Sequence, residues 1–324
     1  MRDTALGRTG LRVSRIAFGT WQLGGDWGAF AEEDARKAVR RARELGVNFF
    51  DTAQGYGFGA SERLLGDALR TELREHRDEL VIATKGGLRD TGTGVARDAS
   101  PAALRAGVDA SLTALGVDRI DLYQVHWPDP KVPLAETAGA LRELVEAGKI
   151  RHVGVSNYSA EQMAEFSRVL PVETLQPPYH LFRREIEDTV LPYTRGHGIG
   201  VLVYGPLAHG LLTGTLSGES VFPAGDWRAK SGVFRGETYR RNLAVVRALQ
   251  EFAAFRDMTV SQLAIAWTLA QPGVDVAIVG ARRPHHVEDS LAAADLSLDE
   301  TDLKDIDAIL AEATPVAGPT PESV

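Results

Sequence analysis

The chain has 324 residues, a formal net charge of −8 and no cysteine. The lack of cysteine excludes disulfides, thiolate catalysis and cysteine-ligated zinc, and an acidic balance without a dense Lys/Arg tract argues against a nucleic-acid surface. No signal-type apolar segment follows the N-terminus and no apolar run approaches the roughly 18 residues of a membrane span, so we expect a cytoplasmic protein with no membrane contact.

The predicted elements begin with a small hairpin over 3–14 and a first strand over 15–20, after which strands and helices alternate. Further strands are expected at 47–51, 80–85, 119–126, 151–156, 173–176, 199–204 and 275–280. Helices are expected at 32–45, 61–70, 101–115, 135–147, 160–169, 183–197, 237–256, 260–271, 284–294 and 299–312. A Gly-rich stretch runs from 205 to about 236, and the residues after about 314 are expected to form a flexible tail.

Eight strand-then-helix units follow one another without a linker or a break in composition. Eight units in this length predict an α/β fold of the (β/α)8 TIM barrel type that occupies 1–324 as a single domain, with the N-terminal β-hairpin and extra helices near the C-terminus as additions. A doubly wound sheet is the competing fold. It is disfavoured because no G-x-G-x-x-G follows the first strand and no Walker A sequence occurs.

Polar side chains stand at the expected carboxyl ends of three successive strands. Asp51 closes the second strand, Lys85 the third and His126 the fourth, and Tyr56 lies on the loop after the second. Barrel enzymes carry their chemistry at this end of the strands. Because neighbouring strands lie about 4.8 Å apart, we expect the four side chains to share one small site.

These residue types suit the protonation of a carbonyl oxygen as hydride reaches its carbon. A free tyrosine, with a pKa of about 10, is a poor acid at neutral pH, but a nearby ammonium stabilises the phenolate and a carboxylate keeps the lysine charged. His126 can hydrogen-bond the carbonyl oxygen. Singly, each residue also has a structural interpretation, such as a loop-capping Asp, a structural Lys–Asp pair, a core His or a packed Tyr. Because all four are expected at consecutive strand ends, the catalytic interpretation is favoured over the structural ones.

The sequence around these residues resembles the aldo-keto reductase superfamily over nearly the whole chain. The resemblance begins with Asn48-Phe49-Phe50-Asp51-Thr52-Ala53, Tyr56-Gly57, Ser61-Glu62, Thr84-Lys85 and Val125-His126-Trp127. It continues with Gly154-Val155-Ser156-Asn157-Tyr158, with the loop from Tyr204 to Gly214, and with Gly280-Ala281-Arg282. These motifs are long and keep the family's order along the chain.

The resemblance implies an enzyme, monomeric or weakly self-associating, that uses NAD(P)H without a Rossmann fold and reduces small-molecule aldehydes and ketones. It makes Tyr56 the general acid, tuned by Lys85 and Asp51, and has His126 orient the carbonyl. The implied cofactor residues are Ser156, Asn157, Gln176 and Tyr204 for the nicotinamide, Leu207, Gly210 and Leu211 for the pyrophosphate, and Gly280, Ala281, Arg282 and Arg283 for the adenosine phosphate end. The expected cofactor set is completed by Thr20, Trp21, Gly205, Pro206, His286 and Ser290.

Four positions depart from the family's pattern. Gly205 stands where many relatives have Ser, and His180 stands where Asn is common. His286 replaces the usual Gln and Ser290 the usual Asn. All four bear on how the cofactor is held or how a loop is set.

The substrate pocket is expected to be lined by aromatic residues on or near strand-end loops, namely Trp21, Trp27, Phe58 and Trp127. Trp227 and Phe234, after the seventh strand, are candidates to close over it. For each aromatic residue, simple packing of its loop is an equally good interpretation. We expect no metal site, because the pair His285-His286 occurs without an H-E-x-x-H motif.

The expected cofactor is NADP(H), with NAD(H) less favoured. Arg282 and Arg283 follow the eighth strand and precede a helix that starts near Pro284. Two guanidinium groups beside a helix N-terminus form a good anion site, and the 2′-phosphate is what distinguishes NADP(H) from NAD(H). The alternative for both arginines is that they are solvated surface charges.

Two other functions remain open at this stage. Potassium-channel β-subunits resemble the same family and keep the same four residues, so the chain could be a cofactor-binding regulatory subunit. A metal-dependent barrel isomerase or lyase is the third hypothesis. It would be favoured by strand ends rich in carboxylates, whereas this chain offers mainly Asp51.

Overall fold

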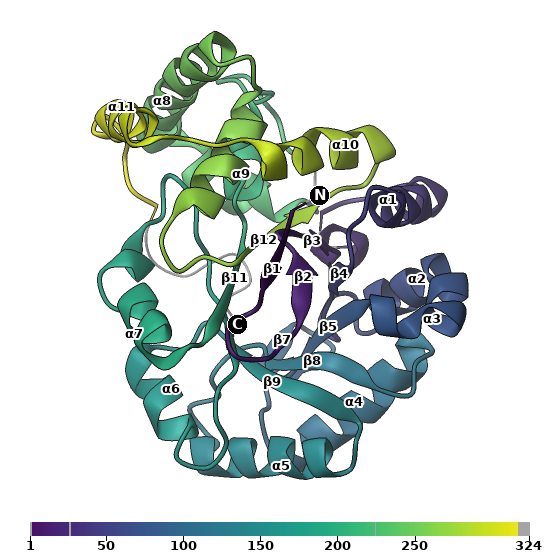
Figure 1. The fold of residues 1–324 in the computed structure, drawn as a ribbon. Helices are drawn as coiled ribbons and strands as arrows, with labels where there is room; N and C mark the ends of the chain where they lie inside the picture. Colours follow the sequence, from purple (N-terminus) through teal and green to yellow (C-terminus); the bar gives the residue numbers. More distant parts are fainter. Residues whose placement is uncertain (1, 26, 224, 317–324) are drawn as a thin grey trace.

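The computed structural model describes residues 2–25, 27–223 and 225–316. Eight parallel strands close into a barrel in the order β10-β11-β12-β3-β4-β5-β8-β9 (Figure 1). These strands are β3 (Ile16–Gly19), β4 (Phe49–Asp51), β5 (Val81–Gly86), β8 (Ile120–Val125), β9 (Ile150–Ser156), β10 (Thr174–Gln176), β11 (Gly200–Tyr204) and β12 (Val276–Gly280). The predicted (β/α)8 barrel is confirmed, and every predicted strand lies within two residues of its observed position.

Helices surround the barrel (Figure 1). They are α1 (Glu32–Glu44), α2 (Ala60–Ala68), α3 (Arg70–Glu75), α4 (Pro101–Leu115), α5 (Leu134–Glu146), α6 (Ala160–Phe166), α7 (Val190–His197), α8 (Gly236–Phe255), α9 (Val260–Ala270), α10 (Pro284–Ala292) and α11 (Glu300–Leu310). Three of them, α6, α9 and α11, begin with a complete capping box, in which the side chains of Ser159, Thr259 and Asp299 accept from the third residue of their helices. These side chains satisfy N–H groups that a helix start leaves unpaired.

The predicted helix over 183–197 is wrong in its first half. Only a 3-10 turn, η3 (Glu185–Glu187), forms there, and α7 begins at Val190. Pro192 explains the late start. It lies in the first turn of α7, where its missing N–H costs nothing, whereas in a helix begun at 183 its ring would clash with the carbonyl four residues earlier.

Two antiparallel hairpins lie outside the barrel. The predicted one, β1 (Asp3–Ala5) with β2 (Arg12–Ser14), packs its turn against the first residue of β11, so it covers the end where the barrel strands begin. The second, β6 (Leu88–Asp90) with β7 (Val95–Arg97), was not predicted. It lies in the connection after β5, at the opposite end of the barrel, beside the strand ends that carry Lys85 and His126.

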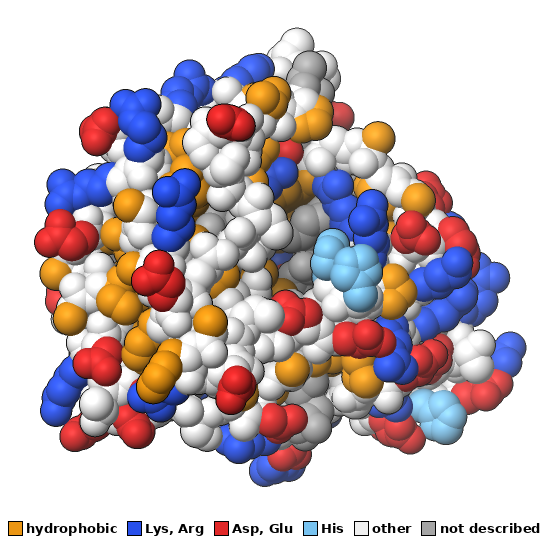
Figure 2. Space-filling view, turned by 90° about the horizontal axis from the view of Figure 1, so that it is seen from above, with side chains coloured by type: hydrophobic (Ala, Val, Ile, Leu, Met, Phe, Trp, Pro, Cys, Tyr) orange, Lys and Arg blue, Asp and Glu red, His pale blue; other side chains and the backbone are white. Residues whose placement is uncertain are grey.

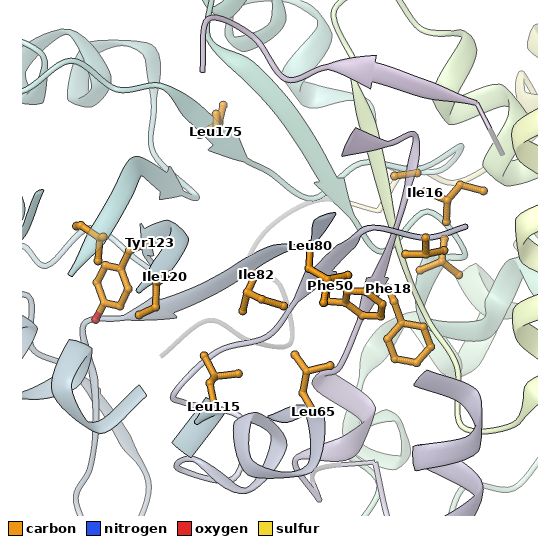
Figure 3. Packing of buried hydrophobic residues seen from close by; sticks show 14 of the residues in the cluster. Ile16, Phe18, Phe50, Leu65, Leu80, Ile82, Leu115, Ile120, Tyr123 and Leu175 are labelled. Carbon is orange, nitrogen blue, oxygen red and sulfur yellow. The ribbon is translucent and has the colours of Figure 1, made fainter. Parts of the chain in front are cut away.

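Side chains alternate between two apolar layers along the barrel strands. One layer, which includes Phe18, Phe50, Ile82, Leu65 and Leu115, packs strands against the surrounding helices (Figure 3). The other layer fills the barrel itself with the alternate residues of the same strands, among them Ala17, Phe49, Ala83, Leu122 and Ile278. Because side chains of a strand point alternately to its two faces, Asp51 and Lys85 fall on the inner face above this second layer.

The C-terminal segment is held further than predicted. The backbone N–H of Thr314 donates to Asn242 Oδ1 at 2.8 Å, and that of Val316 donates to the carbonyl of Phe182 at 2.7 Å. The rest of the predicted tail, 317–324, lies outside the described residues. Within the described part of the chain, no helix combines the length and the apolar character that crossing a bilayer requires. On the face in Figure 2, acidic and basic side chains are interspersed.

Candidate active site

A buried ammonium joins a carboxylate and a phenol at the top of the barrel. Lys85 Nζ donates to Asp51 Oδ1 at 2.6 Å, to the carbonyl of Thr52 at 2.9 Å and to Tyr56 Oη at 3.3 Å. Lys85 is fully buried and Asp51 is 2% exposed. The three bonds use every N–H of the ammonium, so its position is fixed by partners from β4 and the loop that follows it.

The loop after β4 holds Tyr56 at the site through a tight turn. Gly57 has a φ of 62°, and a Cβ there would lie 2.4 Å from the carbonyl oxygen of Gly24, so only glycine fits. Phe58 also has a positive φ, 45°, which is unusual for a bulky residue. Below the turn, Ser61 Oγ donates to Thr20 Oγ1 at 2.7 Å and anchors the start of α2 to the end of the first barrel strand.

His126 faces Tyr56 from the end of β8. The two ring centroids lie 5.6 Å apart at 80°. Burial, and next the positive charge of Lys85, lower the pKa of His126 well below its ordinary value, so the imidazole is neutral at physiological pH. Within the described residues its Nδ1 is buried without a hydrogen-bond partner. Two hydrogen bonds hold the backbone of His126. Its N–H donates to the carbonyl of Gly86, and its carbonyl accepts from Asn157 Nδ2.

A second group of polar side chains lies at the ends of β9, β10 and β11. Ser156 Oγ donates to the carbonyl of Gln176 at 2.8 Å. Asn157 Nδ2 donates to Ser156 Oγ at 3.0 Å, and Tyr204 Oη donates to Asn157 Oδ1 at 2.9 Å. Asn157 has a left-handed φ of 63°, a conformation that Asn tolerates better than most residues. These bonds set the amide and phenol groups in place before any ligand arrives.

A pocket, partly open to solvent, runs from Gln176 and Tyr204 of this group to the first, seventh and eighth strand-end connections. Most of its lining comes from residues singled out in the sequence, namely Thr20, Trp21, Trp27, Asp51, Tyr56, Gln176, Tyr204, Gly205, Pro206, Leu207, Gly210 and Gly280. At the floor, a Cβ on Gly280 would lie 1.9 Å from Gln22 Oε1, so the bare backbone leaves room for that side chain.

Other predicted site residues lie outside the lining. Leu211 and Ala281 are buried in apolar clusters. Trp127 is buried beneath the guanidinium of Arg97, 5.1 Å from its ring centre, and Phe58 is half-buried on its turn. Packing is therefore the interpretation that the geometry gives to Trp127.

The residues expected at the adenosine phosphate end surround the start of α10. Arg282 donates to the carbonyl of Trp27 at 2.7 Å and lies over the ring of Phe30, whereas Arg283 is exposed. His286 is exposed in the first turn of α10, and Ser290 is buried one turn later. Arg282 thus joins the connection after β12 to the one after β3, a role that the sequence did not indicate.

Sequence reasoning missed several lining residues, chiefly Gln22, His209, Thr213 and Arg228. Arg228 lies in η5 (Trp227–Lys230), where Asp226 holds it through three hydrogen bonds, and its Nη1 donates to the carbonyl of His209 at 3.3 Å. No motif marks this arginine. The only available signal was its place next to Trp227, in a long connection after a barrel strand.

Three tryptophans and one histidine, which we call the tryptophan cluster, gather over the pocket. Trp21 stacks on Trp227 with centroids 6.2 Å apart, and Trp27 meets both edge-on at 4.9 and 5.7 Å. His209 packs edge-on against Trp227 at 5.1 Å. Trp21 also stacks on Tyr56 at 6.3 Å. Trp227 therefore reaches across the barrel mouth, while Phe234 is buried beside it, 5.9 Å away.

Polar groups gathered at the carboxyl ends of a closed (β/α)8 barrel are the arrangement of a barrel enzyme. A model of the aldo/keto reductase family matches residues 15–311. The chain is 43% identical over 312 residues to aldo-keto reductase YhdN of Bacillus subtilis (96% of this chain, 94% of that one). It is 34% identical over 318 residues to the NADH-specific methylglyoxal reductase of Escherichia coli (93% and 96%). The glycerol dehydrogenase AKR11B4 from Gluconobacter oxydans superposes with a TM-score of 0.86 at 39% identity (96% and 95%). The chain belongs to the aldo/keto reductase family.

Proposed function

We propose that the protein reduces aldehydes and ketones to alcohols with a nicotinamide cofactor, and that Tyr56 is the proton donor. The observation that carries the proposal is the buried ammonium of Lys85, which lies 2.6 Å from Asp51 Oδ1 and 3.3 Å from Tyr56 Oη. A positive charge at this distance stabilises the phenolate that forms when Tyr56 gives up its proton. The phenol lines the pocket, so a carbonyl group can reach it.

The residues around the pocket fit a nicotinamide dinucleotide. At the end near Tyr56, the amides of Asn157 and Gln176 and the hydroxyl of Ser156 match the hydrogen-bonding groups of a carboxamide. The aromatic face of Tyr204 lines the pocket beside them. Elsewhere in the lining, Gly210 presents bare backbone beside the guanidinium of Arg228, 3.0 Å from where a Cβ would lie, and this combination suits a pyrophosphate.

The chain's own residues then perform the proton transfer. A bound reduced nicotinamide supplies the hydride that adds to the carbonyl carbon. Neutral His126, which faces the Tyr56 ring, holds the carbonyl oxygen by a hydrogen bond. Tyr56 passes its proton to that oxygen, and the alcohol forms as the Tyr56–Lys85 pair takes up the phenolate charge. The tryptophan cluster keeps bulk water from the reacting atoms.

We assign NADP(H) as the preferred cofactor. Arg283 is exposed at the start of α10, and Arg282 beside it is held against Trp27. Together they place positive charge at a helix start, where a 2′-phosphate would bind. Because a relative at 34% identity is named NADH-specific, the assignment rests on the arginines of this chain. A cytoplasmic monomer or weak homo-oligomer, built as one domain, completes the proposal.

The experiment is a steady-state assay of wild type and Tyr56→Phe with aldehydes, ketones and sugars, with NADPH and NADH in parallel. Wild type should consume NADPH and show a KM for NADH at least about tenfold higher, since charge-assisted bonds contribute roughly 1.5–3 kcal/mol each. Tyr56→Phe should lower kcat by about 10²- to 10⁴-fold, the usual worth of general acid catalysis, while calorimetry still detects NADPH binding.

Two results would contradict the proposal. If no carbonyl compound were reduced by wild type with either cofactor, the chain would be no reductase. If Tyr56→Phe kept more than about a tenth of the wild-type kcat, the general acid would have to be another group. Lower KM for NADH than for NADPH would overturn only the choice of cofactor.

A further inference from the structure

The second oxygen of Asp51 is bound by two buried amides. Asp51 Oδ1 accepts from Lys85, while Oδ2 accepts from Gln176 Nε2 at 2.9 Å and from Gln124 Nε2 at 3.3 Å. The two amides are themselves joined, because Gln176 Nε2 also donates to Gln124 Oε1 at 3.3 Å. Gln124, on β8, is fully buried, and no motif in its sequence context assigns it a role.

The barrel leaves space for Gln124 at one place. Gln124 is paired in register with Lys85 on one side and with Gly154 on the other. A Cβ at Gly154 would lie 3.0 Å from Gln124 Cγ and 2.2 Å from Thr174 Oγ1. Because Gly154 on β9 has no side chain, Gln124 and Gln176 can contact each other inside the barrel beneath the site.

A fully buried amide is costly unless its polar atoms are bonded, and a carboxylate oxygen inside a barrel has the same requirement. The two amides supply hydrogen-bond donors to Asp51 Oδ2, and this oxygen supplies the acceptor that the amides need. With Oδ2 bound by two amide donors, the Asp51 carboxylate is turned so that Oδ1 faces Lys85. Without Gln124, Oδ2 keeps a single donor, and the carboxylate gains freedom to turn away from the ammonium.

We propose that Gln124 is a positioning residue which, with Gln176, orients Asp51 toward Lys85 and thereby links the occupied cofactor pocket to proton donation by Tyr56. Gln176 carries the link because it both lines the pocket and donates to Asp51. The charged and titratable groups around this chain of contacts are Asp51, Tyr56 and Lys85 from β4, β5 and their connection. They are joined by His126, directly after β8, and by the buried Glu62 of α2, whose carboxyl interacts with the charge of Lys85. The inference rests on the proposed reductase activity.

The test is a double-mutant cycle of Gln124→Met and Asp51→Asn. Methionine keeps the length of the side chain and removes both hydrogen-bonding ends. In the wild-type background, Gln124→Met should lower kcat about tenfold, shift the pH profile of kcat, and leave the KM for NADPH within about twofold. In the Asp51→Asn background the same change should lower kcat by no more than about twofold, since the charged acceptor is gone.

Thr174→Val is the matched control. It replaces a fully buried polar side chain on the next strand but one of the same barrel, and Thr174 makes no contact with Asp51 among the bonds described. Its kcat and pH profile should equal those of wild type. Thermal unfolding of every variant separates loss of fold from loss of positioning.

Three outcomes would overturn the inference. One is a Gln124→Met enzyme with wild-type kcat and pH profile. Another is the same loss of kcat in both backgrounds, because Gln124 would then act independently of Asp51. The third is an equal loss in Thr174→Val, which would make the effect one of general packing. Failure of wild type to reduce any carbonyl compound would instead remove the proposed function itself, so the two failures are distinguishable.

Discussion

The two halves of the site are built in different ways. On one side, Asp51, Lys85 and His126 stand at the ends of neighbouring barrel strands, and pairing between β4, β5 and β8 sets their spacing. On the other side, His209 and Arg228 lie in the connection between β11 and α8, whose described residues form the 3-10 turns η4 (Ala208–Thr213), η5 and η6 (Gly232–Phe234). The first half is fixed by the backbone ladder and the second by contacts between side chains.

The second half contains two strained backbone positions in a row, whereas the first half has one, Phe58, on the turn that carries Tyr56. Ala208 and His209 both adopt left-handed backbone conformations, with φ of 47° and 55°. Such a conformation costs roughly 1–2 kcal/mol for a residue with a side chain, and here the stacking of His209 among the tryptophans offsets it. The comparison teaches that the proposed chemistry lies on the half fixed by strand pairing, which we call the rigid half, and the proposed enclosure of ligand on the half held by side-chain contacts.

The largest effect should come from the rigid half. Lys85→Met removes the ammonium that stabilises the Tyr56 phenolate, so kcat should fall by about 10²- to 10⁴-fold, while the dissociation constant for NADPH, measured by calorimetry, should change little. The variant also leaves the Asp51 carboxylate unpaired, which should cost about 3–5 kcal/mol of unfolding free energy.

The double variant Asp51→Asn with Lys85→Met keeps the site electrically neutral and serves as the control for folding. It should be more stable than Lys85→Met alone and no more active. If Lys85→Met folded normally and reduced aldehydes at a wild-type rate, the division between the two halves would be wrong.

An intermediate effect should come from the half that is held by side-chain contacts. Arg228→Ala removes a guanidinium that lines the pocket, and NADPH affinity should fall about tenfold or more because charge-assisted bonds to phosphate are lost. The kcat at saturating NADPH should stay within about twofold of wild type. Arg235→Ala is the matched control, since Arg235 lies exposed in the same connection and does not line the pocket. Equal losses in both variants would point to a disturbed connection.

The smallest effect should appear in stability rather than activity. Burial, and then the neighbouring His209 and Arg183, lower the pKa of His180 well below its ordinary value of 6.5. The unfolded chain therefore binds a proton that the folded chain rejects, and the free energy of unfolding falls as pH drops below 6.5. His180→Asn should remove roughly 1 kcal/mol of the loss seen between about pH 6.5 and 5.5.

Denaturant titrations of wild type and His180→Asn at the two pH values measure this difference. Asn can still accept the Phe182 N–H that His180 Nδ1 accepts at 3.2 Å, so the variant should fold normally. Parallel pH curves for the two proteins would show that His180 is protonated equally in the folded and unfolded chains.

The sequence predicted the rigid half well and the other half poorly, for physical reasons. Strand ends are marked by apolar runs that stop, and the closed barrel then brings those ends together, so Asp51, Lys85 and His126 could be placed in advance. The connection after β11 has no repeating pattern, and side-chain stacking decides its path. Arg228 was missed for that reason.

Two further omissions have the same kind of cause. The β6–β7 hairpin surrounds Gly92, whose φ is 78°, and the turn signal was present in Asp90-Thr91-Gly92. It was overlooked because the strands have three residues each, too few for a periodic pattern. Gln124 was overlooked because no neighbour in the sequence explains a single amide in a buried strand. Its partners, Asp51 and Gln176, are 73 and 52 positions away.

The tryptophan cluster also gives the protein a built-in optical reporter. Three of the five tryptophans lie at the pocket, because Trp21 and Trp27 line it and Trp227 stacks on Trp21. Indoles this close share excitation energy, and a reduced nicotinamide absorbs light in the range where indoles emit. Binding of the reduced cofactor should therefore quench the fluorescence of all three tryptophans together. The oxidised form does not absorb in this range and should leave most of the tryptophan fluorescence unchanged. Trp267, stacked on Tyr179 in the core, supplies a constant background.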